Sequence, residues 1–191
     1  MSNFVDLPAD LPVPVDDGAA RHLPGRRMPN LSLPSTDGAE AELSALGPGL
    51  TVLYVYPLSG RPGVDLPAGW DSIPGARGCT PEACGFRDHY GELQAAGADA
   101  LFGLSSQSTD YQAEFAERIG LPFALLSDMR LELAQALDLP TFTAQQQRLY
   151  KRMTLVLRGS VIEHAFYPIF PPDKHAAEVL RWMRDRPAPE E

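Results

Sequence analysis

The two cysteines of the chain, Cys79 and Cys84, are the residues with the clearest chemical potential, and they lie five positions apart in one segment. Outside a secreted protein, such a local pair indicates redox or metal chemistry more than a structural staple. The reactive form of cysteine is the thiolate, and a free thiol with a pKa near ~8.5 is mostly protonated at neutral pH. A site that uses these sulfurs must therefore stabilise negative charge.

The residues that follow Cys79 predict a helix with this cysteine at its N-terminal end. Thr80-Pro81-Glu82 fits a first helical turn, where proline is tolerated because its missing N–H has no partner within the helix. A helix N-terminus carries about half a positive charge and unpaired N–H donors, and both lower the pKa of a thiol. We therefore expect Cys79 to be the nucleophile.

Helix geometry limits what the two sulfurs can do. Five helical residues separate the Cα atoms of Cys79 and Cys84 by about 8.7 Å, whereas a disulfide requires about 4.4–6.8 Å. The pair cannot bond within one intact helix, so a disulfide requires the first turn to unwind. Gly78 and Gly85 lower the resistance to that change. This arrangement suits a reversible, catalytic bond better than a permanent one.

The hydrophobic pattern predicts an α/β fold with a mixed central sheet flanked by helices. The β-branched and aromatic run at 50–56 is the best candidate for a central strand, and a right-handed crossover should join it to a parallel strand at 98–104. A loop rich in proline and glycine at 57–78 precedes the cysteine helix. The other expected strands are 30–34 and 39–43 (an N-terminal hairpin), 123–126, 152–157 and 161–166, and the expected helices are 79–96, 109–119, 131–137 and 173–184, the last with Asp173 as N-cap.

Length and composition fit one domain of 191 residues. Residues 1–27 are rich in Pro, Asp and Gly and predict an extended N-terminal arm, and 28–187 are expected to form the domain. Sixteen Lys and Arg against 25 Asp and Glu give a net charge of −9, which argues against a nucleic-acid or anionic-membrane partner. The chain has no long apolar run and no signal-peptide pattern, so we expect a cytoplasmic protein.

The segment GCTPEACGFRD at 78–88, after the strand LTVLYVYP, resembles the active-site segment of peroxiredoxins. It is most similar to the Q-type, or bacterioferritin-comigratory-protein, class, in which a resolving cysteine follows the peroxidatic one by five residues. Segments at 28–46, 152–168 and 171–183 resemble the first hairpin, the late hairpin and the last helix of that family. The resemblance implies a thioredoxin-like fold and a peroxidase that reduces hydrogen peroxide and alkyl hydroperoxides. It further implies a thioredoxin-like reductant, no cofactor or metal, and a monomer.

The resemblance also implies roles for individual residues. Cys79 would be the peroxidatic cysteine and Cys84 the resolving cysteine that forms an intramolecular disulfide with it. Arg152, at the start of the late strand, would stabilise the thiolate and orient the peroxide, because its guanidinium stays charged and presents a fixed fork of donors. Glu82 matches the helix carboxylate common in the family.

The loop before Cys79 departs from the family pattern. The family places proline seven and threonine three residues before the peroxidatic cysteine, where this chain has Ser72 and Ala76. The loop is instead expanded, and Pro57 can serve as the motif proline. Either the Ser59 hydroxyl or backbone donors are then expected to replace the threonine hydroxyl. The side chains expected to reshape the entrance are Arg61, Trp70 and Arg77.

Other functions of the cysteine pair are weaker alternatives. A zinc site would need histidines to join the cysteines, and the four in the chain lack convincing ligand spacing (His22, His89, His164 and His175). A general thiol–disulfide oxidoreductase would use C-x-x-C, and a redox sensor or copper-delivery protein would use C-x-x-x-C with a partner histidine. The last alternative is that the two cysteines are small buried residues without chemical function.

Overall fold

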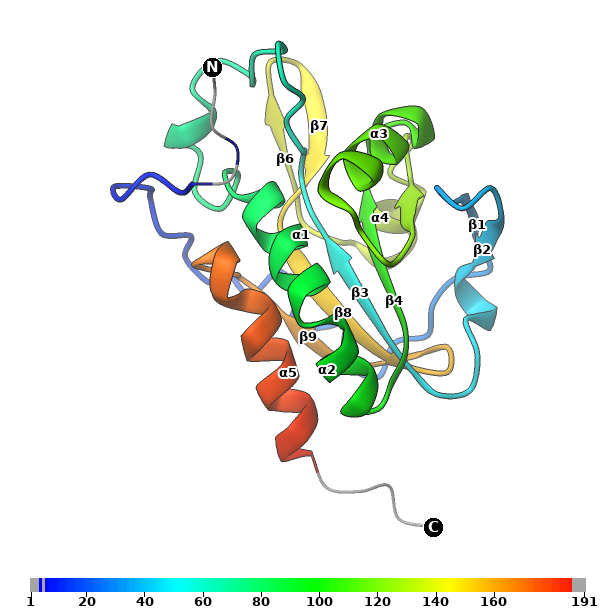
Figure 1. Ribbon diagram of the computed structural model, residues 1–191. Coiled ribbons are helices and arrows are strands. Elements are labelled where there is room, and N and C mark those ends of the chain that lie inside the picture. The colour runs from blue at the N-terminus through cyan, green and yellow to red at the C-terminus, as the bar shows by residue number, and fades with distance from the viewer. Residues whose placement is uncertain (1–3, 5, 187–191) are drawn as a thin grey trace.

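The computed structural model describes residues 4 and 6–186. The strands of its central sheet are β3 (Leu50–Val55), β4 (Ala98–Ser105), β5 (Leu125–Ser127), β8 (Met153–Arg158) and β9 (Val161–Phe166). They lie in the order β5-β4-β3-β8-β9 (Figure 1). β3, β4 and β5 pair in parallel, whereas β8 is antiparallel to both β3 and β9. The predicted mixed sheet with a central strand at 50–56 is thus confirmed.

One face of the sheet packs against four helices, α1 (Cys79–Asp88), α2 (Tyr90–Ala95), α3 (Thr109–Ile119) and α5 (His175–Asp185). Alternate residues of a strand point to opposite faces, so Val52 and Tyr54 point toward these helices. Tyr54 stacks on Phe86 of α1 with ring centroids 4.6 Å apart, and Phe115 of α3 is buried in the same cluster. This packing fixes α1, and with it both cysteines, above the centre of the sheet (Figure 1).

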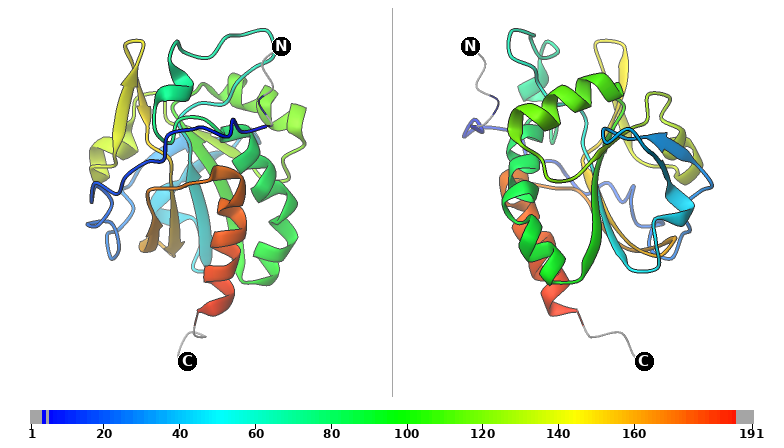
Figure 2. Two further views of the ribbon diagram at one scale, coloured as in Figure 1. Left: turned by 90° about the vertical axis from the view of Figure 1, so that its left-hand side faces the viewer. Right: turned by 45° about the vertical axis from the view of Figure 1, so that its right-hand side comes forward.

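The opposite face packs against α4 (Glu132–Leu137), the N-terminal hairpin of β1 (Ser32–Pro34) and β2 (Glu40–Glu42), and part of the arm. Ala20 and Leu23 of the arm are buried in the same cluster as Leu53 and Val55 of β3. The arm therefore lies along the body, and it also passes over the N-terminal end of α5 (Figure 2). The domain boundary at residue 28 stays a prediction; its other end, residue 187, and residues 1–3 and 5 of the arm lie outside the described residues.

The structure differs from the predicted elements at three places. The cysteine helix is not continuous over 79–96, because His89 leaves the helical conformation between α1 and α2. A second hairpin, β6 (Thr141–Ala144) and β7 (Gln147–Tyr150), was not predicted. Its turn places Gln145 and Gln146 at φ 45° and 66°, where glycine or asparagine would have given the usual signal.

The third difference is the start of the last helix. Asp173 is not an N-cap, because it lies inside a short 3-10 helix, η3 (Pro172–Lys174), that precedes α5. Two more 3-10 helices are η1 (Leu43–Ala45) and η2 (Trp70–Ser72), the latter inside the long loop before α1.

Among the described residues, no helix combines the length and the apolar character needed to cross a membrane.

Candidate active site

Cys79 is the first residue of α1, at the end of the long loop that follows β3. The chain enters the helix through Gly78, whose φ of 110° lies in the left-handed region that favours glycine. Cys79 is only 4 % exposed, whereas Cys84 on the same helix is half-buried. Both are free thiols, as the helix-distance argument requires. The predicted placement of the pair on one helix is confirmed.

The sulfur of Cys79 has two donors beside it. Nη2 of Arg152 lies 3.2 Å from Sγ, and the backbone N–H of Leu58 also donates to the sulfur. The thiol itself points to the carbonyl oxygen of Ala76 at 3.8 Å. A guanidinium and an amide N–H at one sulfur favour its anionic form, since both interactions strengthen when the sulfur carries charge.

Arg152 is held in place by the loop that precedes α1. Its side chain donates to the carbonyl oxygens of Gly75, Ala76 and Arg77 at 3.1–3.3 Å and forms an ion pair with the carboxylate of Glu82. Both charged side chains are buried, with exposed fractions of 1 % and 0 %. Arg152 itself precedes β8 rather than beginning it, since that strand starts at Met153. Through these five contacts the guanidinium joins the sulfur, the loop and α1.

Charge at the site is set by burial as well as by these contacts. Burial raises the pKa of Cys79, the Arg152 guanidinium opposes that rise, and the Glu82 carboxylate adds to it, for a net increase. The lowered pKa predicted for Cys79 from the helix N-terminus is therefore wrong. Burial also raises the pKa of Glu82 against the attraction of Arg152. The Cys79 thiol and the Glu82 carboxyl thus both interact with one buried cation, the Arg152 guanidinium.

The Ser59 hydroxyl does not replace the missing threonine at the sulfur. Ser59 is buried, and it donates its backbone N–H and its hydroxyl to the side-chain oxygen of Gln107, at 3.0 and 2.9 Å. The alternative, a backbone donor, is what the structure contains, because the Leu58 N–H contacts Cys79. Sequence reasoning missed Gln107, whose only signal is its position just after the β4 strand, at an edge where functional side chains gather.

The side chains expected to reshape the entrance divide into two groups. Trp70 and Arg77 line a small cavity against Cys79. Arg61 does not, because its guanidinium binds Glu114 of α3 at 3.2 Å and lies over the ring of Tyr111. Arg61 therefore anchors the expanded loop before α1 to α3. This loop, residues 57–78, is called the inserted loop below.

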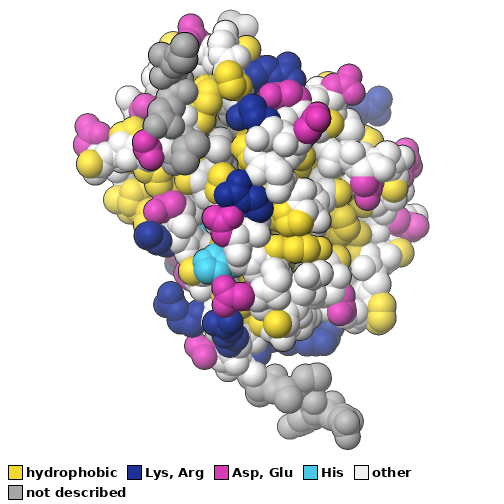
Figure 3. Space-filling view, viewed as in Figure 1, with side chains coloured by type: hydrophobic (Ala, Val, Ile, Leu, Met, Phe, Trp, Pro, Cys, Tyr) yellow, Lys and Arg dark blue, Asp and Glu magenta, His cyan; other side chains and the backbone are white. Residues whose placement is uncertain are grey.

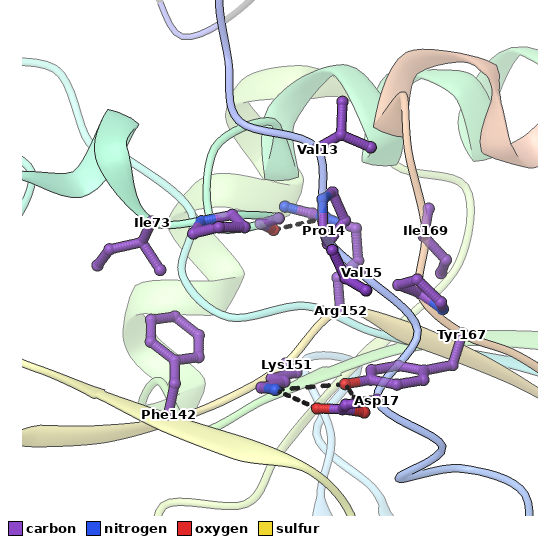
Figure 4. Close-up of a pocket in the computed structure, with 13 residues that line it drawn as sticks. Val13, Pro14, Val15, Asp17, Ile73, Phe142, Lys151, Arg152, Tyr167 and Ile169 are labelled. Carbon is purple, nitrogen blue, oxygen red and sulfur yellow. Dashed lines mark hydrogen bonds and ion pairs between the residues drawn. The ribbon is translucent and has the colours of Figure 1, made fainter.

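A separate apolar pocket of about 370 Å³ lies beside Arg152, between the N-terminal arm and the inserted loop (Figure 4). Val13 and Val15 of the arm, Ile73 of the loop and Phe142 of β6 contribute apolar walls. One side is closed by a polar contact in which Lys151 and Tyr167 both donate to Asp17, at 2.8 and 2.9 Å. This contact ties the arm to the body of the protein.

Within the described part of the chain, no group of three or more His, Cys, Asp or Glu side chains is placed to hold a metal ion. Acidic and basic side chains are interspersed over the face that carries α1 and α5 (Figure 3).

Comparison with known proteins places the chain in a family. The family model described as Redoxin matches residues 23–180. The putative peroxiredoxin bcp of Coxiella burnetii is 30% identical over 159 residues, which are 82% of this chain and 95% of that protein. The chain belongs to the redoxin family, in its peroxiredoxin Q branch. The matched residues contain both cysteines and Arg152, and they leave most of the N-terminal arm outside.

Further relatives and a solved structure agree with this placement. The chloroplastic peroxiredoxin Q of Triticum aestivum is 32% identical over 162 residues, 84% of this chain, and the chain spans 66% of the length of that protein. The crystal structure of peroxidoxin BcpB from Mycobacterium tuberculosis superposes with a TM-score of 0.69 at 27% identity, covering 87% of this chain and 100% of that one. The thioredoxin-like fold predicted for this peroxiredoxin is confirmed.

Proposed function

We propose that this redoxin is a thiol peroxidase that reduces hydrogen peroxide and alkyl hydroperoxides with Cys79 as the peroxidatic residue. The observation that carries the proposal is the 3.2 Å contact between Nη2 of Arg152 and Sγ of Cys79 at the first residue of α1. A guanidinium in this position can stabilise the thiolate and also polarise an O–O bond brought to the sulfur. The membership in a family whose named relatives are peroxiredoxins supports the same reaction.

In the first step, the Cys79 thiolate attacks the terminal oxygen of the hydroperoxide. The S–O bond forms as the O–O bond breaks, so that sulfur is oxidised to a sulfenic acid and the peroxide is reduced. The leaving oxygen takes a proton and departs as water or as an alcohol. Arg152 and the Leu58 N–H lie where they can stabilise the charge that moves from the sulfur to the oxygens.

In the second step, Cys84 resolves the sulfenic acid. Its thiolate attacks the sulfur of Cys79, the S–S bond forms, the S–O bond breaks, and hydroxide leaves as water once protonated. Because the two residues lie in one helix, α1 must unwind at its start before the sulfurs can meet. A dithiol protein of the thioredoxin type then reduces the disulfide by exchange. We also propose that the protein works as a monomer in the cytoplasm, where its free thiols would be maintained.

Stopped-flow measurement of peroxide consumption by the reduced protein tests the reaction. The wild type should consume one equivalent rapidly, and Cys79→Ser should not. Cys84→Ser should still form a sulfenic acid, detectable by dimedone labelling and mass spectrometry, but no intramolecular disulfide. Equal peroxide consumption by the wild type and Cys79→Ser would contradict the proposal and leave a general disulfide-exchange role as the better reading.

A further inference from the structure

The apolar pocket beside Arg152 is not used by the two steps of the proposed peroxidase reaction. Neither cysteine is among the residues that line it. Its volume of about 370 Å³ falls within the range of roughly 300–1,000 Å³ that is typical of small-molecule sites in proteins. The pocket is therefore large enough to hold a ligand of its own.

Apolar side chains form most of the pocket wall, and they come from four separate segments of the chain. In the view of Figure 4, Ile73 and Phe142 lie on one side of the pocket and Ile169 lies on the other. Val13 and Val15 of the arm also line it, and they are 61 % and 82 % exposed. The other apolar lining residues are Pro14, Pro74 and Pro168. A ligand with an apolar body would gain free energy by covering this surface.

Contacts within the protein hold these walls in place. Pro14 packs on Gly75, where a Cβ atom would lie 3.6 Å from Cβ and Cγ of the proline ring. The ring centroid of Phe142 lies 5.9 Å from that of Trp70, in an apolar cluster that also contains Ile73. A ligand that enters walls already in position does not have to order them, which favours binding.

The polar part of the lining carries an excess of positive charge. Lys151 and Arg152 contribute two cations, whereas Asp17 contributes one carboxylate. Glu82, which also pairs with Arg152, is not a lining residue. The pocket is thus positive in a chain whose net charge is −9. This charge favours an anionic ligand over a neutral or cationic one.

Lys151 has the donor that such an anion needs. Its ammonium group carries three N–H donors. Two of them bind Oδ2 of Asp17 at 2.8 Å and the hydroxyl oxygen of Tyr167 at 3.3 Å, and no third acceptor contacts Nζ among the described residues. The side chain is 38 % exposed, so a ligand can approach it. The Arg152 guanidinium, by contrast, is buried against the sulfur, the loop carbonyls and Glu82.

We propose that this pocket binds a small organic acid, whose carboxylate accepts a hydrogen bond from Nζ of Lys151 and whose apolar body lies between Ile73 and Phe142 and the opposite wall. A fatty acid of medium chain length has this chemistry, with one carboxylate at the end of an apolar chain. The arm residues that line the pocket lie before residues 23–180, the part that matches the family model. The site is independent of the proposed function, and its tests use no peroxide.

Isothermal titration calorimetry of the reduced full chain with octanoate, below the concentration at which octanoate forms micelles, tests the site. The wild type should bind one equivalent saturably. 1-Octanol has the same chain length without the charge and should bind about tenfold more weakly, because it makes no charge-assisted hydrogen bond with Lys151. A lack of saturable octanoate binding would overturn the site. Equal affinities for octanoate and 1-octanol would overturn recognition of the carboxylate.

Two valine substitutions locate the bound octanoate. Val15→Asp places a further carboxylate at an exposed position of the pocket wall and should weaken octanoate binding about tenfold through charge repulsion. Val64→Asp makes the same change at an exposed valine of the inserted loop that does not line this pocket, and it should leave the affinity unchanged. Equal affinities of the two variants would place octanoate elsewhere and overturn the proposal.

Two further variants separate the Lys151 donor from the attachment of the arm. Lys151→Met removes the ammonium group and should lower the affinity for octanoate about tenfold, but not that for 1-octanol. It also breaks the contact with Asp17. Asp17→Asn is the control, because it weakens the same contact while removing the carboxylate that competes for Lys151, and it should strengthen octanoate binding. Weaker binding in both variants would show that only the attachment of the arm matters, and it would overturn the role of Lys151.

Discussion

The carboxamide of Gln107 binds the backbone of Ser59 from both sides. Its oxygen accepts the Ser59 N–H at 3.0 Å, and its nitrogen donates to the Ser59 carbonyl oxygen at 3.1 Å. The side chain of Gln107 thus pairs with both the N–H and the carbonyl of Ser59, as the backbone of a neighbouring strand would. Ser59 follows Leu58, whose N–H donates to Cys79, so Gln107 fixes the position of a donor that it does not touch. We regard Gln107 as a positioning residue.

Replacement of Gln107 by leucine should therefore affect the sulfur at a distance. The change leaves the buried N–H and carbonyl of Ser59 without partners, which costs about 1–3 kcal/mol per group in the free energy of unfolding. It should also raise the pH at which the rate of Cys79 alkylation by iodoacetamide reaches half of its maximum, because the Leu58 donor loses its fixed position. Gln135→Leu, at an exposed glutamine of α4, is the matched control. A Gln107→Leu protein that is destabilised but keeps the wild-type alkylation profile would reduce Gln107 to a structural residue.

Substitution of Arg152 by lysine tests whether the fork of donors is needed or only the charge. Lysine keeps the positive charge but cannot reach the sulfur, the loop carbonyls and Glu82 together. We expect the rate of peroxide reduction to fall about 100-fold, as when one preorganised donor is removed from an active site. Stopped-flow kinetics at equal protein concentration measure this. Arg158→Lys, at a partly exposed pair with Glu163, should leave the rate unchanged.

The carboxylate of Glu82 should oppose ionisation of Cys79. Because Glu82 raises the pKa of Cys79 and shares its cation, Glu82→Gln should move the alkylation profile of Cys79 to lower pH. A shift to higher pH would show instead that Glu82 acts mainly by orienting Arg152.

The effect of Glu82 on stability follows from its own titration. Burial raises the pKa of Glu82, so the folded protein holds this proton more tightly than the unfolded chain does. The resulting stabilisation is full below the ordinary pKa of 4.5 and is lost as pH rises through the folded value. The melting temperature of the wild type should therefore fall across that window relative to Glu82→Gln, as followed by circular dichroism. If the melting temperatures of the wild type and of Glu82→Gln changed in parallel with pH, this prediction would be wrong.

Asp17 should make the attachment of the arm sensitive to acid. The hydrogen bond from Lys151 and the further ones from the Ala19 N–H and Tyr167 lower the pKa of Asp17 from 3.8 to about 2. Its stabilising contribution is present above the ordinary pKa and is lost as pH falls toward 2. Asp17→Asn should remove no more than about 1 kcal/mol at neutral pH, because the pair is exposed.

The pH dependence gives the sharper test of the Asp17 contact. The wild type should lose melting temperature more steeply between pH 4 and 2 than Asp17→Asn does, because only the wild type has this carboxylate to protonate. Calorimetry at several pH values measures the two slopes. Asp65→Asn, on the inserted loop, should follow the wild type. Identical slopes for Asp17→Asn and the wild type would mean that the Asp17 contact carries no measurable stability.

Local interactions allowed the sequence by itself to determine the helix of the cysteines and the strands of the sheet. A proline two residues after Cys79 and the periodic apolar side chains fix α1 through contacts within a few residues, so its first residue could be predicted. The same holds for α3, whose predicted and observed limits agree. That the two sulfurs cannot bond in the intact helix also follows from helix geometry alone.

Only the tertiary structure decided what surrounds the sulfur. Arg152 lies 73 residues from Cys79 in the chain, and Gln107 lies 48 residues from Ser59. No local pattern determines such contacts, because they depend on which strands pair and how closely the loops pack. Burial is likewise a property of the assembled molecule, and here it outweighs the attraction of Arg152 in setting the pKa of Cys79.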